Sequence, residues 1–359
     1  MRTPVALAPV HRGRGLRRFA RRRFARGLLA IAIVVGVAGC GSSGSGGSGP
    51  GPAACSWHLQ RSGESADDLS GVAFPDNLHG WAVGGIDRPV IRVTSDGGAT
   101  WRAQHAAGTN GLNSVAFTDD RHGWAVGVHN LLLVTTNRGG SWKPGNPDVS
   151  YDGNLYGITF VGAQHGWIVG SGGVIRATAN GGRTWTAERS GTGADLAHVQ
   201  FTDLRHGWIT TDNGEILRTT DGGTTWTRVY EGSAKDNEEV ANVMFLTPQL
   251  GWIAGSRDDG LSNHGLITKT TDGGQSWKAT DVKQFDDVRF GDVDFTDSLH
   301  GWVTGYQGEL WYSDDGGADW GSRTTPARAL GEQINDMVFR DARHGWAVGE
   351  SGTIEACTT

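Results

Sequence analysis

Short runs of alternating hydrophobic and polar residues recur along most of the chain at a nearly constant interval. Seven of these runs end in Phe and read GVAF, SVAF, GITF, HVQF, NVMF, DVDF and DMVF. Their last residues are Phe74, Phe117, Phe160, Phe201, Phe245, Phe295 and Phe339. Alternation with a period of two is typical of a β-strand that buries one face. The pattern therefore predicts seven similar strands.

A Gly-Trp dipeptide follows each of these runs and begins a second predicted strand, such as GWAVG at residues 80–84. Its Trp residues are Trp81, Trp124, Trp167, Trp208, Trp252, Trp302 and Trp346. In the fifth unit the dipeptide follows Leu250, and in the other six it follows a His. These residues are His79, His122, His165, His206, His300 and His344. A Gly and a short apolar run, such as GVIRAT at residues 173–178, then predict a third strand.

The third strand leads into a motif of the form S/T-x-D-x-G-x-S/T-W, which resembles the Asp-box or BNR repeat. It occurs six times, and its acidic or amide residues are Asp96, Asn137, Asn180, Asp221, Asp272 and Asp315. Asp and Asn accept hydrogen bonds from turn amides, Gly adopts backbone angles closed to other residues, and the Trp buries a large ring. We interpret the motif as structural. Only Trp311 stands outside the repeated pattern of the 15 Trp residues.

Four strands in a unit of roughly 43 residues match one blade of a β-propeller. The seven Gly-Trp units thus predict an all-β, seven-bladed propeller with four antiparallel strands per blade. The ends of the chain account for the missing seventh Asp-box. Residues 56–60 align with the strand after an Asp-box, and GTIEACTT at residues 352–359 aligns with the start of one. The N-terminal strand should therefore complete the last blade.

The first 39 residues read as a lipoprotein signal peptide. Basic residues come first, and an eleven-residue apolar stretch, Leu28 to Ala38, follows them. This stretch is shorter than the roughly 20 residues that span a membrane. The tetrapeptide ending at Cys40 resembles the bacterial lipobox, which implies diacylation of Cys40 and a lipid anchor on the outer face of the cell membrane or in the periplasm. An ordinary cleavage site beside a chance Cys is the alternative, and both Sec and Tat export stay open.

The remaining sequence divides into a Gly/Ser/Pro-rich flexible tether at residues 40–54 and the propeller at residues 55–359. The chain has 32 basic and 38 acidic residues, and the signal peptide alone holds nine Arg and no acidic residue. The rest therefore carries 23 basic against 38 acidic residues. A body of that charge repels phosphate backbones, which argues against nucleic acid as a partner.

The HGWAVG string, the Phe before it and the DGG-x-S/T-W string after it resemble photosystem II stability and assembly factors. The resemblance covers residues 56–359. It implies a seven-bladed propeller with a non-enzymatic role in binding or assembly. We expect the partner to be a membrane or envelope protein, and we expect a monomer without a cofactor.

Glycoside hydrolysis is the alternative function, because Asp-boxes also occur in sialidases and glucan hydrolases. Glycosidases need two carboxyl groups at a set separation, and sialidases need a Tyr nucleophile and an arginine cluster. The sialidase Arg-Ile-Pro string is absent, and the nearest string is Asp87-Arg88-Pro89. A third class is an envelope-maintenance scaffold without a single ligand.

The repeated His residues suggest a metal ring, but neighbouring copies stand a blade apart, too far for ligand distances of about 2 Å. We interpret them as turn residues that bond the local backbone. Acidic pairs such as Asp258-Asp259 and Asp286-Asp287 do not match the spacing of an EF-hand. We therefore predict no metal site.

Variable loops mark the face on which we expect a partner. The distance from the Gly-Trp to the Asp-box Trp is 18 residues in blades 2, 3, 4 and 6, 20 in blade 1 and 25 in blade 5, where residues 256–265 are inserted. Loops that vary on a rigid scaffold commonly carry binding. The candidate contacts, which include the link at residues 281–291, are Arg88, Arg257, Asp258, His264, Phe285, Arg289 and Tyr306. Loop variation without function is the alternative.

Two cysteines remain if Cys40 carries lipid, and both fall in the blade shared by the two ends of the chain. Aligned with the third blade, Cys357 takes the place of Thr178 and Cys55 takes the place of Arg183. These positions flank one hairpin turn, so their Cβ atoms could approach the roughly 3.8 Å of a disulfide. We predict a Cys55–Cys357 disulfide in the oxidising environment outside the cytoplasm. Two free thiols are the alternative.

Overall fold

A computed structural model of the chain describes residues 55–60, 67–106, 108, 110–149, 152–232, 238–258, 260, 262–280 and 285–358. These residues belong to one compact unit, Pro50–Thr359. The predicted signal peptide, the tether and Cys40 lie outside the described residues.

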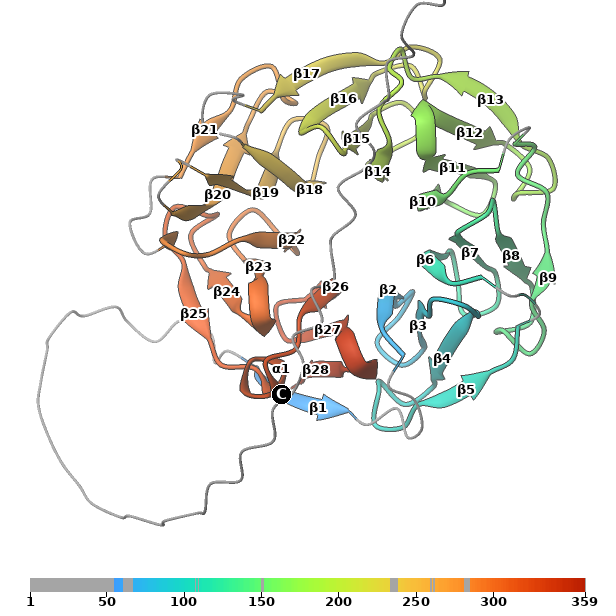
Figure 1. Cartoon of the computed structure of the whole chain (residues 1–359), viewed down its shortest axis with the longest axis horizontal. Helices are drawn as coiled ribbons and strands as arrows, with labels where there is room; N and C mark the ends of the chain where they lie inside the picture. The colour runs from blue at the N-terminus through green and yellow to red at the C-terminus, as the bar shows by residue number, and fades with distance from the viewer. Residues whose placement is uncertain are drawn as a thin grey trace, which may run out of the picture. The chain divides into compact units, whose positions relative to one another are not determined.

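The described residues form seven four-stranded antiparallel sheets arranged in a ring (Figure 1), as the repeats predict. Blade 1 contains β2 (Leu69–Ala73), β3 (Gly80–Gly84), β4 (Val90–Thr94) and β5 (Arg102–Gln104). Blade 2 contains β6 (Leu112–Phe117), β7 (Gly123–Gly127), β8 (Leu132–Thr135) and β9 (Lys143–Pro144). Blade 3 contains β10 (Leu155–Val161), β11 (His165–Gly170), β12 (Val174–Thr178) and β13 (Thr186–Arg189). Blade 4 contains β14 (Leu196–Phe201), β15 (Gly207–Thr211), β16 (Glu215–Thr219) and β17 (Thr227–Glu231).

The remaining blades follow the same plan. Blade 5 contains β18 (Glu239–Phe245), β19 (Gly251–Asp258), β20 (Asn263–Thr270) and β21 (Lys278–Ala279). Blade 6 contains β22 (Phe290–Phe295), β23 (Gly301–Gly305), β24 (Leu310–Ser313) and β25 (Gly321–Arg323). Blade 7 contains β26 (Ile334–Asp341), β27 (His344–Gly349), β28 (Ile354–Thr358) and β1 (Ser56–Gln60). The described helical segments are α1 (Pro326–Leu330) and the 3-10 turns η1 (Ser171–Gly173), η3 (Tyr306–Gly308) and η4 (Glu350–Gly352).

The first strand of each blade lies nearest the centre of the ring and the fourth lies at the rim (Figure 1). No helix among the described residues is long and apolar enough to cross a membrane.

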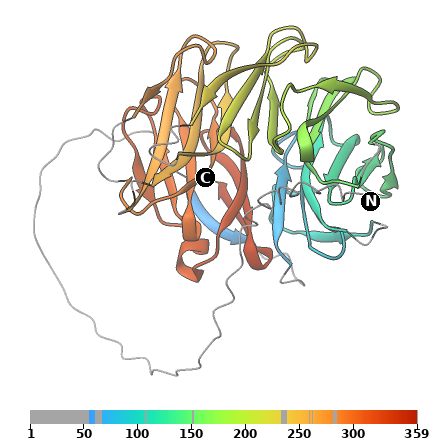
Figure 2. The same ribbon diagram turned by 45° about the horizontal axis from the view of Figure 1, so that its top comes forward.

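Blade 7 is completed by the N-terminal strand, as the sequence predicts. Strand β1 lies alongside β28 (Figure 2), with Ser56 opposite Thr358 and Gln60 opposite Ile354. A disulfide joins Cys55 to Cys357, whose Cα atoms are 5.3 Å apart. Both strand pairing and a covalent bond thus close the ring at this blade.

Aromatic stacking joins every pair of neighbouring blades. The Phe at the end of each first strand stacks on the Gly-Trp ring of the preceding blade, with centroids 3.5–3.9 Å apart. The pairs are Phe74–Trp346, Phe117–Trp81, Phe160–Trp124, Phe201–Trp167, Phe245–Trp208, Phe295–Trp252 and Phe339–Trp302. Such pairs contribute about 0.5–1.5 kcal/mol each beyond the burial of their area.

The same Phe ring meets the edge of its own blade's Asp-box Trp, as between Phe201 and Trp226 at 5.9 Å. In blade 7, Trp57 of β1 takes this place and meets Phe339 at 5.7 Å. The Gly of each Gly-Trp dipeptide is required because the Phe ring of the same blade lies over it. At Gly207, an added Cβ would lie 2.5 Å from the ring of Phe201.

The Asp-box residues hold the turn between the third and fourth strands. In blade 1, Asp96 Oδ1 accepts hydrogen bonds from Thr94 Oγ1 and the Thr100 amide, both at 2.8 Å. Thr100 Oγ1 donates to the other carboxylate oxygen at 2.6 Å, and this bond is the main reason that the pKa of Asp96 is lowered. Asn137 and Asn180 accept from the corresponding Ser141 and Thr184 amides at 3.0 Å. These side chains therefore make their hydrogen bonds within their own turns.

Candidate functional site

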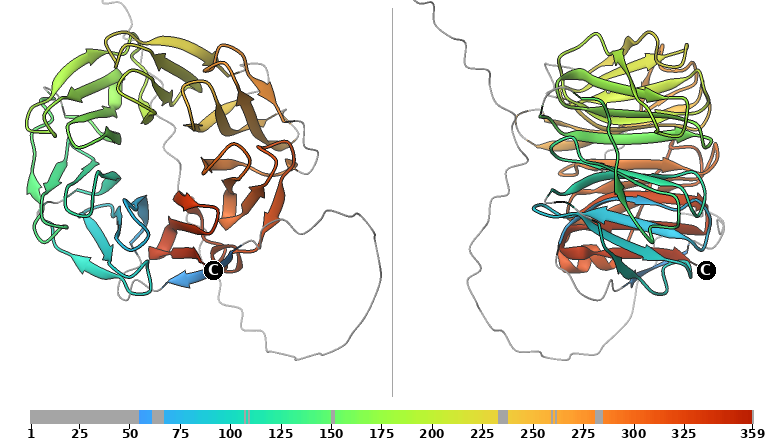
Figure 3. Two further views of the ribbon diagram at one scale, coloured as in Figure 1. Left: turned by 180° about the vertical axis from the view of Figure 1, so that it is seen from behind. Right: turned by 90° about the vertical axis from the view of Figure 1, so that its right-hand side faces the viewer.

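The ring has two faces with different turns (Figure 3). We call one the Asp-box face; it carries the turns between first and second strands and between third and fourth strands. We call the other the loop face; it carries the turns between second and third strands and the links between blades.

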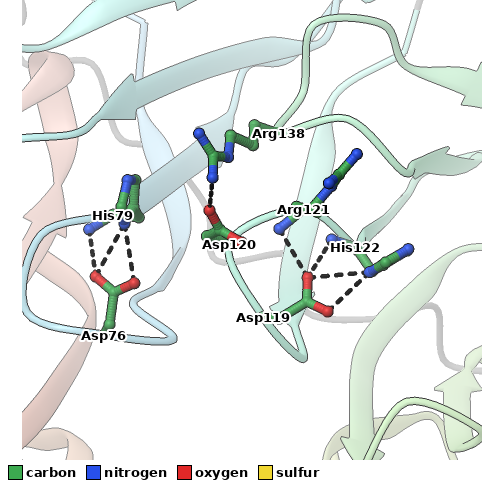
Figure 4. Close-up of polar contacts among 7 residues, drawn as sticks. All are labelled: Asp76, His79, Asp119, Asp120, Arg121, His122 and Arg138. Atoms are coloured by element: carbon green, nitrogen blue, oxygen red, sulfur yellow. Dashed lines mark hydrogen bonds and ion pairs between the residues drawn. The ribbon is translucent and has the colours of Figure 1, made fainter.

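On the Asp-box face, Nδ1 of five of the repeated His residues lies within hydrogen-bonding distance of the carboxylate of an Asp three residues earlier, and Figure 4 shows two of these pairs. In blade 2, Asp119 Oδ1 accepts the amides of Arg121 and His122 at 2.7 Å, and His122 Nδ1 lies 2.8 Å from Oδ2. The other pairs are Asp76–His79, Asp203–His206, Asp297–His300 and Asp341–His344. These rings therefore bond a side chain, not the local backbone as predicted.

The sequence holds a signal that could have found these pairs, because an Asp stands three residues before the His in five of the six blades that carry this His. In blade 5, where Leu250 replaces His, Thr247 Oγ1 replaces the carboxylate and accepts the Leu250 amide at 3.0 Å. In blade 3, Gly162 stands three residues before His165. Among the described residues, no three His, Cys, Asp or Glu side chains are placed to share a metal ion.

On the loop face, side chains of the blade links hold the neighbouring turns in place. Asp195, in the link to blade 4, accepts the amide of Gly172 in η1 of blade 3 at 2.8 Å. Asp68 accepts the amide of Ser351 in η4 of blade 7 at 3.1 Å. These bonds between neighbouring blades give the loop face a defined surface.

The main irregularity of the loop face is the hairpin formed by β19 and β20. Each strand has eight residues, whereas the second and third strands of the other blades have four to six. The predicted contacts Arg257, Asp258 and His264 lie in its distal part, where Arg257 is opposite His264 and Asp258 is opposite Asn263. The residues inserted in blade 5 thus lengthen a strand pair.

The link between blades 5 and 6 supports this hairpin. His264 Nδ1 lies 2.7 Å from Asp286 Oδ1, and Arg289 donates to Asn263 Oδ1 at 2.7 Å. The amide of Asp287 also donates to the Asn263 carbonyl at 2.7 Å. The structure therefore brings Arg257, Asp258, His264 and Arg289 into one region, although they are up to 32 positions apart in the sequence.

Phe285 was wrongly predicted as a surface contact. Its side chain is 2% exposed, and its ring meets Trp311 at 5.3 Å and Phe290 at 4.8 Å. This cluster also explains Trp311, the one Trp outside the repeats. Phe285 packs the link against blade 6 and presents no surface to a partner.

Tyr306 begins η3 on the loop face of blade 6 and is 55% exposed. Its amide donates to the Arg289 carbonyl at 2.9 Å, so it adjoins the supported hairpin. Helix α1 packs on η3, where Thr325 Oγ1 donates to the Gly308 carbonyl at 2.7 Å. Leu330, at the end of α1, is 58% exposed. Exposed apolar and aromatic residues near arginines have the composition of protein-binding sites.

Arg88 is not part of this group. It lies in blade 1, its side chain is 68% exposed, and it donates to Asp67 Oδ2 at 2.7 Å. Blade 7 stands between blade 1 and blade 6 in the ring (Figure 1). The candidate partner site that the structure assembles is therefore Arg257, Asp258, His264, Arg289 and Tyr306, which we call the blade 5–6 surface.

A shallow hollow lies on blade 3, with a volume of about 420 Å³. It is lined by Gly173 and residues 188–193, including Glu188 and Arg189. Burial raises the pKa of Glu188 to about 7. The hollow does not include any residue of the blade 5–6 surface.

Comparisons with known proteins agree with this architecture. The family model of photosynthesis system II assembly factor YCF48 matches residues 53–194, 146–231 and 191–285. No curated protein matches the sequence. A solved structure of YCF48 bound to D1 peptide is 22% identical with a TM-score of 0.70, over 84% of this chain and 97% of that one.

YCF48 from Cyanidioschyzon merolae is also 22% identical, with a TM-score of 0.67, over 85% of this chain and 99% of that one. The GH74 xyloglucanase from Xanthomonas campestris is 15% identical with a TM-score of 0.63, over 85% of this chain and 54% of that one. At these identities the likeness of the structures concerns the fold alone. The family model, in contrast, spans well over half of the sequence, and the chain therefore belongs to the photosynthesis system II assembly factor YCF48 family.

Proposed function

We propose that this protein is an exported, lipid-anchored binding factor that acts without catalysis in the assembly or upkeep of a membrane or envelope protein complex. The family membership carries this proposal, because the family is described as an assembly factor. The YCF48 structure solved with a D1 peptide adds support, since a protein of the same fold there holds a polypeptide.

We further propose that the blade 5–6 surface contacts the partner. The Asp-box face repeats one turn design in most blades, and its carboxylates are occupied by turn amides, hydroxyls and His rings. The blade 5–6 surface departs from the repeat and combines Arg257, Arg289 and Tyr306 with a hairpin held by hydrogen bonds. A surface that is already ordered loses little entropy on binding.

Lipidation of Cys40 and export remain proposals that rest on the sequence. The Cys follows an apolar stretch and precedes a Gly/Ser/Pro-rich segment. The Cys55–Cys357 disulfide is compatible with export, because disulfides persist mainly in oxidising compartments.

Site-specific photocrosslinking in the native membrane tests the partner surface. A photoreactive amino acid replaces Tyr306 on the loop face in one variant and Leu78 on the Asp-box face in a second. The two positions are matched, because each side chain is 55% exposed. We expect the variant at Tyr306 to crosslink one membrane or envelope protein that mass spectrometry identifies reproducibly, and the variant at Leu78 to crosslink none of it.

Crosslinking of that protein from Leu78 alone would refute the assignment of the face. The absence of any membrane or envelope protein from both positions, with the propeller folded and present at native abundance, would refute the proposed function.

A further inference from the structure

One position on the first strand of each blade points toward the first strand of the next blade. A Cβ added at Gly71 would lie 3.2 Å from the Asn113 carbonyl oxygen, and one at Gly157 would lie 3.3 Å from the Val199 nitrogen. A larger side chain there occupies the space between two inner strands. In ring order, the residues at this position of the seven first strands are Gly71, Ser114, Gly157, His198, Asn242, Asp292 and Asp336.

In blades 5, 6 and 7 these side chains form a continuous hydrogen-bonded arc. Asn242 Nδ2 donates to Asp292 Oδ1, and the carboxyl groups of Asp292 and Asp336 are bonded to each other. Val72 of blade 1 donates its amide to Asp336 Oδ2 at 2.7 Å. The arc therefore runs from blade 5 through blades 6 and 7 into blade 1.

Two carboxyl groups can share a hydrogen bond only if one of them holds a proton. Asp292 also accepts the Val293 amide at 2.8 Å and the Met337 amide at 2.9 Å, so it is well supplied with donors as the anion. Asp336 is then the acid that donates. Burial raises the pKa of Asp292 to about 6, and burial with the nearby charge of Asp292 raises the pKa of Asp336 well above its usual range.

We propose that the proton shared by Asp292 and Asp336 joins blade 7 to its two neighbours, so that the contacts of this blade weaken as the proton is lost at rising pH. We call these two residues the carboxyl pair. Blade 7 is the blade that the ring closes on, and its inner strand β26 meets β22 on one side and β2 on the other.

Two contacts between the inner strands of other blades use amide side chains, which do not titrate. Asn113 donates to the Leu155 carbonyl at 2.8 Å, and Gln200 both donates to and accepts from the backbone of Phe245. Blade 7 differs because carboxylates predominate. Besides the carboxyl pair, Asp294 accepts the Phe339 amide at 2.7 Å, and burial raises the pKa of Asp294 to about 7.

On the described elements packed against β22 and β26, no basic side chain lies at mid-strand beside the carboxyl pair. Among the elements packed on β22 and β26, strands β2 and β23 and turn η3 carry no charged residue. Apart from Asp294 on β22, the charged residues of the others stand toward the strand ends: Glu239 on β18, Arg257 and Asp258 on β19, Arg340 and Asp341 on β26 and His344 on β27. Glu239 lies opposite Ser256, and His344 bonds Asp341, while the carboxyl pair sits in mid-strand.

The sign of the pH effect follows from the proton count. We call the contact between β22 and β26 at the carboxyl pair the seam. When the seam is closed, the pair holds a proton that a separated Asp, with a pKa of 3.8, releases. Opening of the seam therefore releases the shared proton, which by itself raises the equilibrium constant of opening about tenfold per pH unit. The raised pKa of Asp294 adds to the rise in the same direction. The rise begins near pH 4 and ends at the raised pKa of the carboxyl pair, so the contribution of the pair is complete below about pH 4 and is lost as the pH rises through the raised pKa.

Hydrogen exchange of the full chain with its disulfide intact tests the proposal at pH 5.0, 6.5 and 8.0. Exchange of peptides from β26 is divided by exchange of peptides from β14 in the same sample, which removes the intrinsic pH dependence. We expect this ratio to rise with pH in the wild type. In Asp336→Asn the amide can donate to Asp292 and accept from Val72 without a titrating proton, so the rise should be shallower by about tenfold per pH unit.

Asp297→Asn is the matched control, because it makes the same change in blade 6 but on the Asp-box face, beside His300. It should leave the β26 ratio at its wild-type pH dependence. An unchanged slope in Asp336→Asn, or a shallower slope in Asp297→Asn as well, would overturn the proposal. If Asp336→Asn does not fold, the wild type still decides: a β26 ratio that is flat between pH 5.0 and 8.0 refutes the role of the pair.

Discussion

Substitution of Gly207 by Ala tests whether the Phe ring over each Gly-Trp motif is held rigidly. Gly207 begins β15, and its backbone does not adopt a left-handed conformation, so Ala fits the chain itself. The added Cβ would lie 2.5 Å from the ring of Phe201, whereas ordinary contacts lie at 3.4–4 Å. The ring must therefore shift by roughly an ångström to restore normal contact.

The shift is opposed on two sides. Phe201 stacks on Trp167 at 3.5 Å and meets the edge of Trp226 at 5.9 Å. Overpacking of a filled core costs about 1–3 kcal/mol. For a domain of this size, that loss corresponds to a decrease in Tm of about 2–5 °C.

Urea unfolding and thermal melts followed by Trp fluorescence measure the effect. The matched control is Gly193→Ala, because a Cβ at Gly193 has no neighbour within 4 Å and its backbone is not left-handed. The control should be neutral or slightly stabilising, since Ala restricts the unfolded chain. A Gly207→Ala protein within about 0.5 kcal/mol of wild type, or an equal loss in the control, would refute the reasoning.

Three further changes have defined outcomes. Cys357→Ser should lower the free energy of unfolding by about 2–5 kcal/mol and remove its sensitivity to reductant, because the bond to Cys55 closes a separation of 302 residues; equal urea midpoints for reduced and oxidised wild type would contradict this. Cys40→Ala should move the protein to the soluble fraction and remove a diacylglycerol mass from the N-terminal peptide, whereas unchanged membrane retention would place the anchor elsewhere. Glu188 has a pKa of about 7 because it is buried, against 4.5 when exposed, so wild-type stability falls as pH rises through this window. Glu188→Gln should therefore gain stability relative to wild type between pH 5 and pH 8 in chemical unfolding, and a pH-independent difference would show that Glu188 does not titrate there.

The ring could be predicted because each blade repeats the same set of sequence motifs. A Phe, a Gly-Trp and an Asp-box recur in one order, and the structure shows that they meet at every junction between blades. The strand composition of blade 7 followed from the same register, since Trp57 occupies the position of an Asp-box Trp.

The contacts that break the repeat were harder to predict. Phe285 lies in a polar link, and its position in the core depends on its contact with Trp311. The periodicity of the sequence does not show that these two residues are close in space. The carboxyl pair was missed because Asp292 and Asp336 fall on the polar half of alternating strands, a half that the pattern assigns to solvent. Alignment of the seven first strands would have placed both residues at the same position in neighbouring blades, but only the ring closure shows that this position faces the next blade.

The departures from the repeat gather in blades 5 to 7, and this links the two proposals. Tyr306 of the blade 5–6 surface begins η3, and η3 packs against β26, the strand that carries Asp336. Loss of the shared proton would loosen β26 beneath η3, so partner capture through Tyr306 should weaken at the pH at which β26 loses protection. Asp336→Asn should make the pH dependence of capture shallower over the same range. Capture by the wild type that stays constant while β26 opens would show that the surface and the carboxyl pair act independently, because the turn would then hold its position without the strand below it.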